Sequence, residues 1–340
     1  MKLFIYEHIT SGALIDEPLP ASLAREGNDM LTAIVQDLAQ LSNIELIILR
    51  DARLEPLENI LNHTAHQLYI IDSANSFQTT YLKAINNADM VLPIAPETDG
   101  VLNRVQQQIL NSNGQLLASD ADAIRICSDK VQCHKQLQGY GIHSPTTIRA
   151  SEWSLKQFNS STGFIIKPQD GAGCIDTYFM TDSLSLKSWL ESNPDELNNM
   201  IIQPYIDGLA ISLSILSDSN DTRVLAINQQ KIKFTDGKLS FIGNIVNGVD
   251  EDDLTHSQAT EIASKVHHAI SGLWGFIGID LILHKKDIFV IDINPRLTTS
   301  YIGLRQSLNH NPAQLLFTMM EHGVSALPEP LQRQAIEVNV

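Results

Sequence analysis

Oxygen-bearing and cationic side chains gather where an apolar strand ends in the C-terminal third of the chain. Residues 289–296, FVIDINPR, begin as a core strand and end in Asp292, Asn294 and Arg296. Asp292 and Asn294 are two residues apart, so they point to the same face of a strand. Clustered oxygen ligands suit Mg²⁺, which binds through one or two carboxylates together with substrate phosphates. The segment therefore predicts a metal site for phosphate chemistry.

A second carboxylate reaches the same place if the chain folds back as a hairpin. Asp280 and Asp292 lie on consecutive predicted strands, separated by the polar turn at 284–287. A hairpin closing at that turn places the two strands side by side, and Asp280 joins the cluster if it faces the same side. The alternative is that both aspartates only cap strand ends. Unpaired carboxylates between apolar neighbours are costly to bury, which favours the metal site.

Phosphates would also need cations and a backbone that can approach them closely. Lys167 ends the predicted strand GFIIKP, and the loop QDGAGC follows at once. Gly171 and Gly173 allow close approach, successive N–H groups can hold a phosphate, and Lys167 adds a positive charge. Lys130, near the start of an earlier predicted helix, is either a second phosphate ligand or a solvated surface lysine.

Alternating strands and helices in the first third predict the scaffold. Short apolar runs predict strands at 2–6, 44–49, 67–72 and 90–95. Apolar residues at helical spacing predict helices at 29–41 and 76–88. This alternation implies a parallel sheet covered by helices. The loops at 6–12 and 95–100 follow strand ends, where such sheets bind ligands.

The later segments predict α+β units rather than further wound units. Ser128 can cap a helix that ends near Gly139. The expected fold class is therefore an N-terminal α/β domain with a parallel sheet, followed by two α+β subdomains. We place these three domains at 1–120, 121–205 and 206–340.

The composition is that of an acidic globular protein. The 340 residues are 43% hydrophobic and 18% charged, with a formal charge of -16. Such acidity argues against nucleic acid or an anionic membrane as a partner. The opening MKLFIYEHITSG has too short an apolar run for a signal peptide, and no stretch approaches a transmembrane span. We expect a cytoplasmic protein whose partners are small molecules.

The order of the motifs resembles the ATP-grasp superfamily of carboxylate–amine ligases. The resemblance extends from Lys130 to Arg305 and rests on SDK, FIIKP with DGAGC, QPYIDG, GIDLIL and IDINPRLTTS. It implies an ATP-grasp fold with a pre-ATP-grasp domain, ATP and Mg²⁺ (alternatively Mn²⁺) as cofactors, and a homodimer. It also implies an ADP-forming ligase that makes an amide through an acyl phosphate.

The same resemblance implies roles for individual positions. The ATP phosphates would be held beneath a lid loop at 170–174 by Lys130, Lys167, Gly171 and Gly173. The adenine and ribose would be contacted by Gln203, Tyr205, Ile206 and Asp207, the last because Ala210 replaces the family's usual ribose-binding carboxylate. The metal ligands would be Asp280, Asp292 and Asn294, although many members carry glutamate in place of Asp292. The catalytic residues would be Lys167 and Arg296, the latter stabilising the acyl phosphate and the tetrahedral intermediate.

A narrower resemblance concerns the substrates. KLFIYEHITSG and NPRLTTSYIGLR are closest to the tyramine–glutamate ligase group of methanofuran-type cofactor biosynthesis. It implies that glutamate is joined to tyramine, tyrosine or a related amine. The residues expected to bind these substrates are Glu7, His8, Gly12, Arg296, Thr299, Tyr301 and Arg305.

Several alternatives stay open at this point. One alternative is that Tyr301 is a packing residue, and another is that Glu7 and His8 only end a strand. The chain could be another amino-acid or dipeptide ligase. It could also be a non-catalytic nucleotide-binding protein, although none of the expected lysines or carboxylates is lost.

Overall fold

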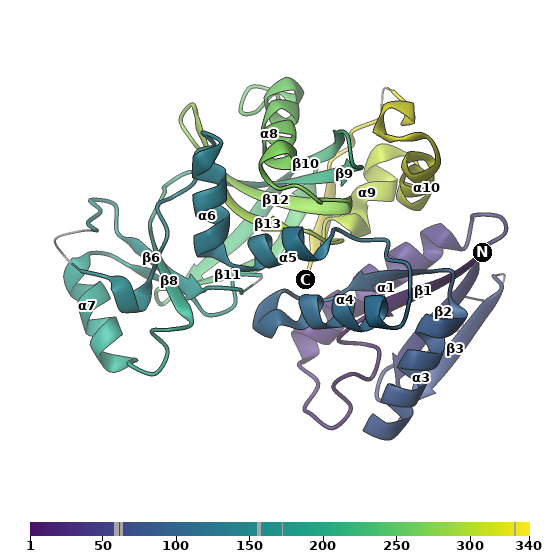
Figure 1. Ribbon diagram of the computed structural model, residues 1–340. Coiled ribbons are helices and arrows are strands. Elements are labelled where there is room, and N and C mark those ends of the chain that lie inside the picture. Colours follow the sequence, from purple (N-terminus) through teal and green to yellow (C-terminus); the bar gives the residue numbers. More distant parts are fainter. Residues whose placement is uncertain (58–60, 62–63, 155–157, 172, 330) are drawn as a thin grey trace.

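Two β-sheets organise the chain (Figure 1). The computed structural model describes residues 1–57, 61, 64–154, 158–171, 173–329 and 331–340. The N-terminal sheet has four strands in the order β3-β2-β1-β4, and the second sheet has ten strands. In Figure 1 the N-terminal sheet lies at the lower right, and the remainder of the chain lies above it and to its left.

The N-terminal sheet is parallel throughout, as the alternating pattern predicts. Its strands are β1 (Lys2–Glu7), β2 (Glu45–Asp51), β3 (His66–Ile71) and β4 (Met90–Ile94). Its helices are α1 (Ala21–Leu38), α3 (Ala74–Asn87) and α4 (Val101–Asn111), with the short turn η1 (Thr98–Gly100) preceding α4. The four predicted strands are therefore confirmed to within two residues.

The two faces of this sheet bury alternate residues of each strand. On one face, Leu3 and Ile5 of β1 pack in the same core as Leu31 and Ile34 of α1. On the other, Phe4 and neighbouring aromatic residues pack beneath α3 and α4. Helices thus cover both faces, which leaves the carboxyl ends of the strands as the place where a ligand can enter.

Helix α1 begins earlier than its apolar pattern predicts. The predicted start was Asp29, whereas the helix begins at Ala21 after Pro20. The first two turns are rich in small and polar residues because they pass over the strand ends rather than over the core. There Gly27 faces the carboxylate of Glu7.

The second sheet is mostly antiparallel and runs through both later parts of the chain. Along the sheet its strands are β13 (Asp287–Asn294), β12 (Gly275–His284), β9 (Leu209–Ser217), β10 (Thr222–Thr235), β11 (Lys238–Val246), β7 (Thr177–Met180), β6 (Phe164–Pro168), β8 (Met200–Pro204) and β5 (Ile148–Arg149), with β14 (Ile336–Asn339) paired to β11. The central and C-terminal parts meet where Lys238 lies opposite Tyr178. The predicted combination of α/β and α+β parts is confirmed, while the boundaries at 120 and 205 stay a prediction.

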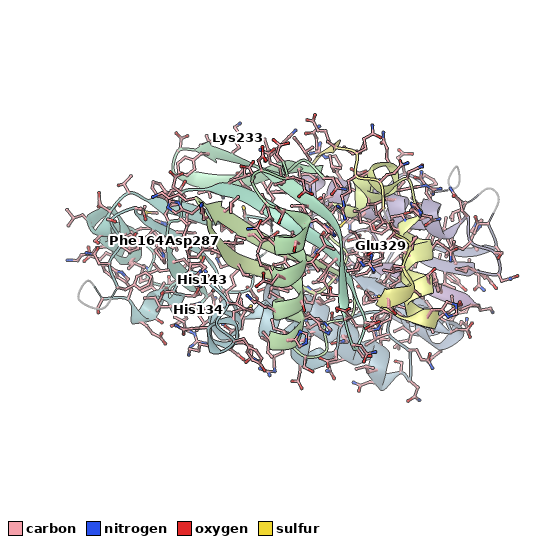
Figure 2. All side chains as sticks on the ribbon, turned by 90° about the horizontal axis from the view of Figure 1, so that it is seen from above. His134, His143, Phe164, Lys233, Asp287 and Glu329 are labelled. Atoms are coloured by element: carbon pink, nitrogen blue, oxygen red, sulfur yellow. The ribbon has the colours of Figure 1, made fainter. Side chains whose placement is uncertain are left out.

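Helices pack against side chains of the second sheet. They are α5 (Ala121–Ser128), α6 (Lys130–Gly139), α7 (Ser183–Ser192) and α8 (His256–Ala269), with the short turn η2 (Ala150–Glu152) before β6. The cap of α6 is Asp129 and not Ser128, because the Asp129 carboxylate accepts from the backbone N–H groups of the first turn. Figure 2 shows His143 on the same side of the molecule as Asp287. The ring centroid of His143 lies 6.0 Å from that of Phe289.

The C-terminal helices join the two sheets into one body. They are α9 (Tyr301–Leu308) and α10 (Pro312–His322), followed by η3 (Val324–Ala326). Leu304 and Leu316 share a hydrophobic core with Leu31 of α1 and Leu46 of β2. This shared core fixes the N-terminal domain against the part of the chain that carries Arg296.

Candidate active site

The predicted hairpin of β12 and β13 forms and brings its carboxylates together. Asp280 lies directly opposite Asp292, so both side chains occupy the same face. The Asn294 amide donates to Asp280 Oδ2 (3.1 Å), and the Gln230 amide donates to Asp280 Oδ1 (2.9 Å). An amide that donates through nitrogen keeps its oxygen available as a ligand. The arrangement therefore presents three oxygen donors at one place.

The negative charge of Asp280 is disfavoured in this cluster. Burial and the neighbouring Asp292 carboxylate raise the pKa of Asp280 to about 6. Lys130 Nζ lies 2.9 Å from Asp292 Oδ2. Burial would lower the pKa of Lys130, but the Asp292 carboxylate outweighs it and the net shift is upward. A divalent ion beside Asp280 would offset the cost of ionising its buried carboxylate next to Asp292.

Lys167 belongs to the same cluster. Burial lowers its pKa, with Asp292 opposing and Lys130 reinforcing the shift, so both groups lie within electrostatic range of its ammonium. Lys167 lies on β6, where it is paired with Ile201 of β8. The structure thus brings both predicted lysines to the predicted carboxylates.

The glycine loop lies over these lysines. Lys130 Nζ donates to the carbonyl of Gly171 at 2.6 Å, so one ammonium links the loop to the carboxylates. Gly173 adopts a φ of +64°, which favours glycine, and open space lies where its side chain would be. Of the predicted lid at 170–174, residue 172 lies outside the described residues.

Arg296 is held by a residue of the N-terminal domain. Its Nε and Nη2 donate to the two carboxylate oxygens of Glu97 at 2.9 and 2.8 Å, and both side chains are nearly buried. The pKa of Arg296 is raised because Glu97 outweighs the effect of burial. Beside Glu97, the backbone N–H of Asp99 donates to the Asp170 carboxylate of the glycine loop at 2.7 Å. The turn after β4 therefore contacts the arginine and the loop together.

The residues expected to contact adenine and ribose differ in the hydrogen bonds that they already make. Gln203 is buried and donates to the Thr147 hydroxyl at 2.8 Å. The backbone of Tyr205 is already paired, because its N–H donates to Gly163 and its carbonyl accepts from Thr162. Within the described chain, the N–H of Ile206 has no such backbone partner. Asp207 is exposed, and its carbonyl accepts from His284.

The predicted residues at the N-terminal end surround the end of β1. The buried Glu7 carboxylate accepts from the N–H and the hydroxyl of Thr10 at 2.7 and 2.6 Å, and burial raises its pKa. Burial lowers the pKa of His8 to about 4. At Gly12, with a φ of +88°, a Cβ would lie 2.6 Å from Ile71, so packing also requires this glycine.

Thr299 and Tyr301 lie near one another in sequence but have different surroundings. Thr299 donates to Glu26 of α1, one residue before the glycine that faces Glu7. Tyr301 is buried, and its hydroxyl donates to Asp37 at 2.8 Å. Arg305 donates to the same carboxylate at 2.8 Å. Asp37 lies three helical turns beyond Glu26, about 16 Å along α1.

The expected substrate contacts of Tyr301 and Arg305 stay a prediction, and both side chains have partners within the chain. Both side chains bind Asp37 at the far end of α1, and Tyr301 also packs edge-on against Phe276 at 5.0 Å. Their structural role is to hold α9 against α1. The packing alternative for Tyr301 is the one that the structure supports.

Comparison with known families decides the kind of protein. A model of the ATP-grasp domain matches residues 127–300, just over half of the chain, and a model of the pre ATP-grasp 3 domain matches residues 44–124. The chain belongs to the ATP-grasp family. It is a carboxylate–amine ligase of that family, an enzyme that binds ATP and forms a carbon–nitrogen bond.

Similar proteins place this ATP-grasp ligase near one group. The tyramine–L-glutamate ligase of Methanocaldococcus jannaschii is 23% identical over 87% of this chain and 82% of its own length. That of Methanocaldococcus fervens is 24% identical over 89% of each. The D-alanine–D-alanine ligase of Pseudothermotoga lettingae is 26% identical over 52% of this chain and 60% of its own.

Solved structures share the same fold. An ATP-grasp superfamily protein from Archaeoglobus fulgidus has a TM-score of 0.68 and 24% identity over 93% of this chain and 88% of that one. The L-amino acid ligase from Bacillus licheniformis has a TM-score of 0.65 and 14% identity over 93% of this chain and 72% of that one.

The ATP-grasp site also contains residues that sequence analysis missed. Glu97, Glu26 and Gln230 bind Arg296, Thr299 and Asp280. The loop that holds Glu97 was expected at the rim of a pocket, but nothing in the spacing singled out its glutamate. Gln230 lies on a long strand whose polar residues are otherwise typical of a solvated face. The contact of Gln230 with Asp280 could not be predicted without the strand register of β10.

Proposed function

We propose that the chain joins the γ-carboxylate of glutamate to an aromatic amine, tyramine or a close relative, in the synthesis of a methanofuran-type cofactor. The observation that carries the proposal is the convergence of Lys130, Lys167, Asp280 and Asp292 at one centre, with Arg296 within electrostatic range of Asp280. The similarity to two tyramine–L-glutamate ligases over most of the chain supports the choice of substrates.

The reaction has two steps. First, a carboxylate oxygen of glutamate attacks the γ-phosphorus of ATP, the bond from that phosphorus to the bridging oxygen breaks, and ADP leaves with the electron pair. Second, the neutral amine attacks the acyl carbon, the bond from that carbon to the phosphate oxygen breaks, and inorganic phosphate leaves. The amine loses one proton to solvent or phosphate. Neither step needs a protein nucleophile, so catalysis consists of positioning and charge stabilisation.

The two lysines hold phosphate oxygens in this proposal. Lys130 contacts both the glycine loop and Asp292, so its ammonium lies between the loop and the carboxylates. A phosphate that enters there exchanges the Gly171 carbonyl for a stronger, charged acceptor. The lowered pKa of Lys167 reflects a buried ammonium short of negative partners, which a phosphate would supply.

Asp280, Asp292 and the Asn294 oxygen are the residues that would hold Mg²⁺. When bound, the ion would neutralise negative charge on the phosphates. The residues fit such an ion because burial and the neighbouring Asp292 carboxylate raise the pKa of Asp280, and a divalent cation would offset both effects. Gln230 and Asn294 orient the Asp280 carboxylate by donating to both of its oxygens.

Arg296 stabilises the charge that develops on the acyl group. Glu97 binds its Nε and Nη2 and fixes the plane of the guanidinium, while Nη1 donates only weakly to the Leu297 carbonyl at 3.3 Å. The Nη1 edge is therefore the one that can turn to an acyl oxygen. Glu97 acts as a positioning residue in this proposal.

Nucleotide and substrates would contact different sets of residues in this proposal. Gln203 and the N–H of Ile206 bind adenine, and Asp207 binds the ribose. Glu7, His8 and Thr299 contact the substrates, because Glu26 and Gly27 of α1 bring Thr299 close to Glu7. The loop at 170–174 covers the acyl phosphate and excludes water, which would otherwise hydrolyse it. A cytoplasmic location and a homodimer complete the proposal.

A dipeptide ligase is the second candidate. It is favoured by the matches to D-alanine–D-alanine ligases across half of the chain. In that case the acceptor amine would be the amino group of a second amino acid, and the chemistry at Arg296 would be unchanged.

The test is ADP release from ATP with Mg²⁺, glutamate and a panel of amines that includes tyramine, tyrosine and each common amino acid. Release that requires glutamate and one aromatic amine, with the matching amide found by mass spectrometry, supports the proposal. Release with two amino acids supports the dipeptide ligase instead. An Arg296→Met variant, which loses the guanidinium but keeps the length of the side chain, controls for contaminating ATPases.

A further inference from the structure

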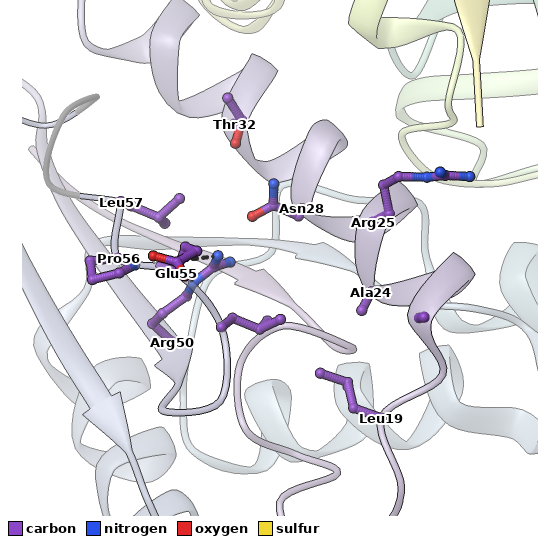
Figure 3. A pocket seen from close by; sticks show the side chains of 11 residues that line it. Leu19, Ala24, Arg25, Asn28, Thr32, Arg50, Glu55, Pro56 and Leu57 are labelled. Carbon is purple, nitrogen blue, oxygen red and sulfur yellow. Dashed lines mark hydrogen bonds between the residues drawn. The ribbon is translucent and has the colours of Figure 1, made fainter.

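An arginine outside the predicted site joins two parts of the N-terminal domain that are incompletely packed against each other. Figure 3 shows Leu19 and Ala24 on one side of a depression of about 510 Å³, and Glu55 and Leu57 on the other. The first side is formed by the segment 13–20 and the start of α1, and the second by the chain that follows β2. Because the depression separates them, side-chain packing fixes the two sides only in part, and hydrogen bonds between them gain importance.

Arg53 makes such hydrogen bonds from the β2 side. Its Nη1 donates to the carbonyl of Glu17 at 2.6 Å, and its Nη2 donates to the carbonyl of Leu14 at 2.7 Å. Its Nε and Nη2 also donate to the two carboxylate oxygens of Asp51, at 2.9 and 2.6 Å. The guanidinium therefore links the end of β2 to a turn of the segment 13–20.

The β2 side of this link is itself well fixed. The Asp51 side chain is buried, and the backbone N–H of Asp51 donates to the carbonyl of Thr10 at 2.8 Å. Burial would raise the pKa of Asp51, but the hydrogen bonds from Arg53 outweigh it and the net shift is downward. Just before it, Arg50 donates through Nε and Nη2 to the carbonyl of Glu55, at 2.9 and 2.7 Å (Figure 3). Arg53 thus extends from a rigid base.

The segment 13–20 has few other attachments. In the part of the chain that the structure describes, its remaining hydrogen bonds join only near neighbours in sequence. Residues 16–18 are exposed, so burial holds this stretch only weakly. Without Arg53 the segment would lose the hydrogen bonds that attach it to β2.

The position of this segment affects the groups at both of its ends. It follows Gly12 directly, and the proposed function assigns the nearby His8 to the substrates. It leads into α1, where Glu26 accepts from the Thr299 hydroxyl. A displaced segment 13–20 would therefore move residues on the substrate side. The lysines and carboxylates assigned to phosphates and metal lie on other elements, so they would stay in place.

We propose that Arg53 is a positioning residue for substrate binding, which holds the segment 13–20 against the end of β2 and so keeps the groups at both ends of that segment in place. The proposal rests on the proposed function, because that function assigns His8 and Thr299 to the substrates. A segment that is ordered beforehand reduces the conformational entropy that binding has to overcome. Loss of Arg53 therefore weakens the binding of the carboxylate or the amine substrate and not that of ATP.

Steady-state kinetics of Arg53→Ala tests this role with the pair of substrates that supports ADP release in the parent. We expect the KM of the carboxylate or the amine substrate to rise about tenfold, and the KM for ATP to change less than about twofold. Arg333→Ala is the matched control, because it removes an exposed arginine that donates to His256 in the C-terminal part of the chain. The control should keep the KM values of the parent. Unchanged substrate KM values in Arg53→Ala, or an equal rise in all three, overturn the proposal.

Arg53→Lys is the second variant if Arg53→Ala does not fold. It keeps the charge, but one ammonium cannot replace the planar fork that reaches Asp51 and two carbonyls together. A raised KM for either substrate with an unchanged KM for ATP again supports the proposal. Substrate KM values equal to those of the parent overturn it.

Hydrogen exchange followed by mass spectrometry measures the attachment of the segment without any turnover. In Arg53→Ala the backbone N–H groups of residues 13–17 should exchange faster than in the parent, while those of β2 keep their rates. Equal exchange of 13–17 in the two proteins overturns the proposal. A failure of the proposed function is seen separately, because then no amide forms in the parent, while the exchange of 13–17 still reports on Arg53.

Discussion

At the scale of single residues, Glu97 is the least expected member of the site. It binds Arg296 through both carboxylate oxygens from a different domain. Glu97→Gln keeps the shape but replaces one charged acceptor by an amide, so the guanidinium loses part of its orientation. We expect kcat to fall about tenfold, in line with one weakened charge-assisted hydrogen bond, while the KM for ATP changes less than about twofold.

The matched control is Glu97→Asp, which keeps the charge on a shorter side chain and should recover part of kcat. Steady-state kinetics on all three proteins makes the comparison. An equal loss in kcat and in ATP affinity would assign Glu97 a general structural role instead.

The Asp280 carboxylate is proposed to bind metal, but its burial is expected to lower the free energy of unfolding. Its raised pKa of about 6, against an ordinary value of 3.8, means that the ionised carboxylate costs folding free energy above that pH. Asp280→Asn removes the cost, so without metal its free energy of unfolding should exceed that of the parent by up to about 3 kcal/mol at pH 7.5. The gain should shrink as pH falls through 6 toward 4, because the carboxyl then takes up its proton.

Chemical unfolding at pH 7.5 and pH 5, with and without Mg²⁺, measures this difference. Mg²⁺ should stabilise the parent and have less effect on Asp280→Asn, because the variant has lost one ligand. The variant should also lose turnover. Equal stabilisation of both proteins by Mg²⁺ would remove Asp280 from the metal site.

At the scale of elements, the β12–β13 hairpin was predictable from the sequence, but the start of α1 was not. The hairpin follows from alternation and a polar turn, which are local features, and these place Asp280 opposite Asp292. The start of α1 was missed because its first turns face Glu7 and a cavity, where the apolar pattern is absent. Glu97 and Glu26 were missed because their partners lie far away in sequence, and only the tertiary arrangement brings them together.

Gly27 tests this reading of α1. In an ordinary helix Gly→Ala stabilises by about 1 kcal/mol, but here a Cβ would lie 2.7 Å from the carboxylate of Glu7. We therefore expect Gly27→Ala to lower the free energy of unfolding by about 1 kcal/mol or more. In a Glu7→Ala background the same change should become neutral or stabilising, as urea unfolding of the four proteins would show. Additive effects would mean that Gly27 and Glu7 do not touch.

At the scale of the whole molecule, the two domains are joined around Asp37. This buried carboxylate accepts from Tyr301 and Arg305, and the backbone carbonyl of the same residue accepts from Asn311. The same interface carries Arg296 and Thr299 to the N-terminal domain.

No helix in the described ranges is long and apolar enough to cross a membrane.

Asp37→Ala should therefore weaken the whole fold. It leaves the buried Tyr301 hydroxyl without an acceptor, at a cost of about 2 kcal/mol or more, while the half-exposed Arg305 can turn to water. Thermal unfolding would measure the loss, with Gln36→Ala on the exposed side of α1 as the control. Equal melting temperatures in the two variants would show that Asp37 does not hold the domains together.

The central claim is that ATP activates a carboxylate as an acyl phosphate at the Lys130–Asp292–Arg296 centre. The direct test is transfer of oxygen-18 from γ-carboxylate-labelled glutamate during turnover with the amine that supports ADP release, followed by mass spectrometry of the phosphate released. The account predicts that one labelled oxygen appears in inorganic phosphate and that the other stays in the amide. Amide formed with unlabelled phosphate would contradict it, because the carboxylate would then have been activated in another way.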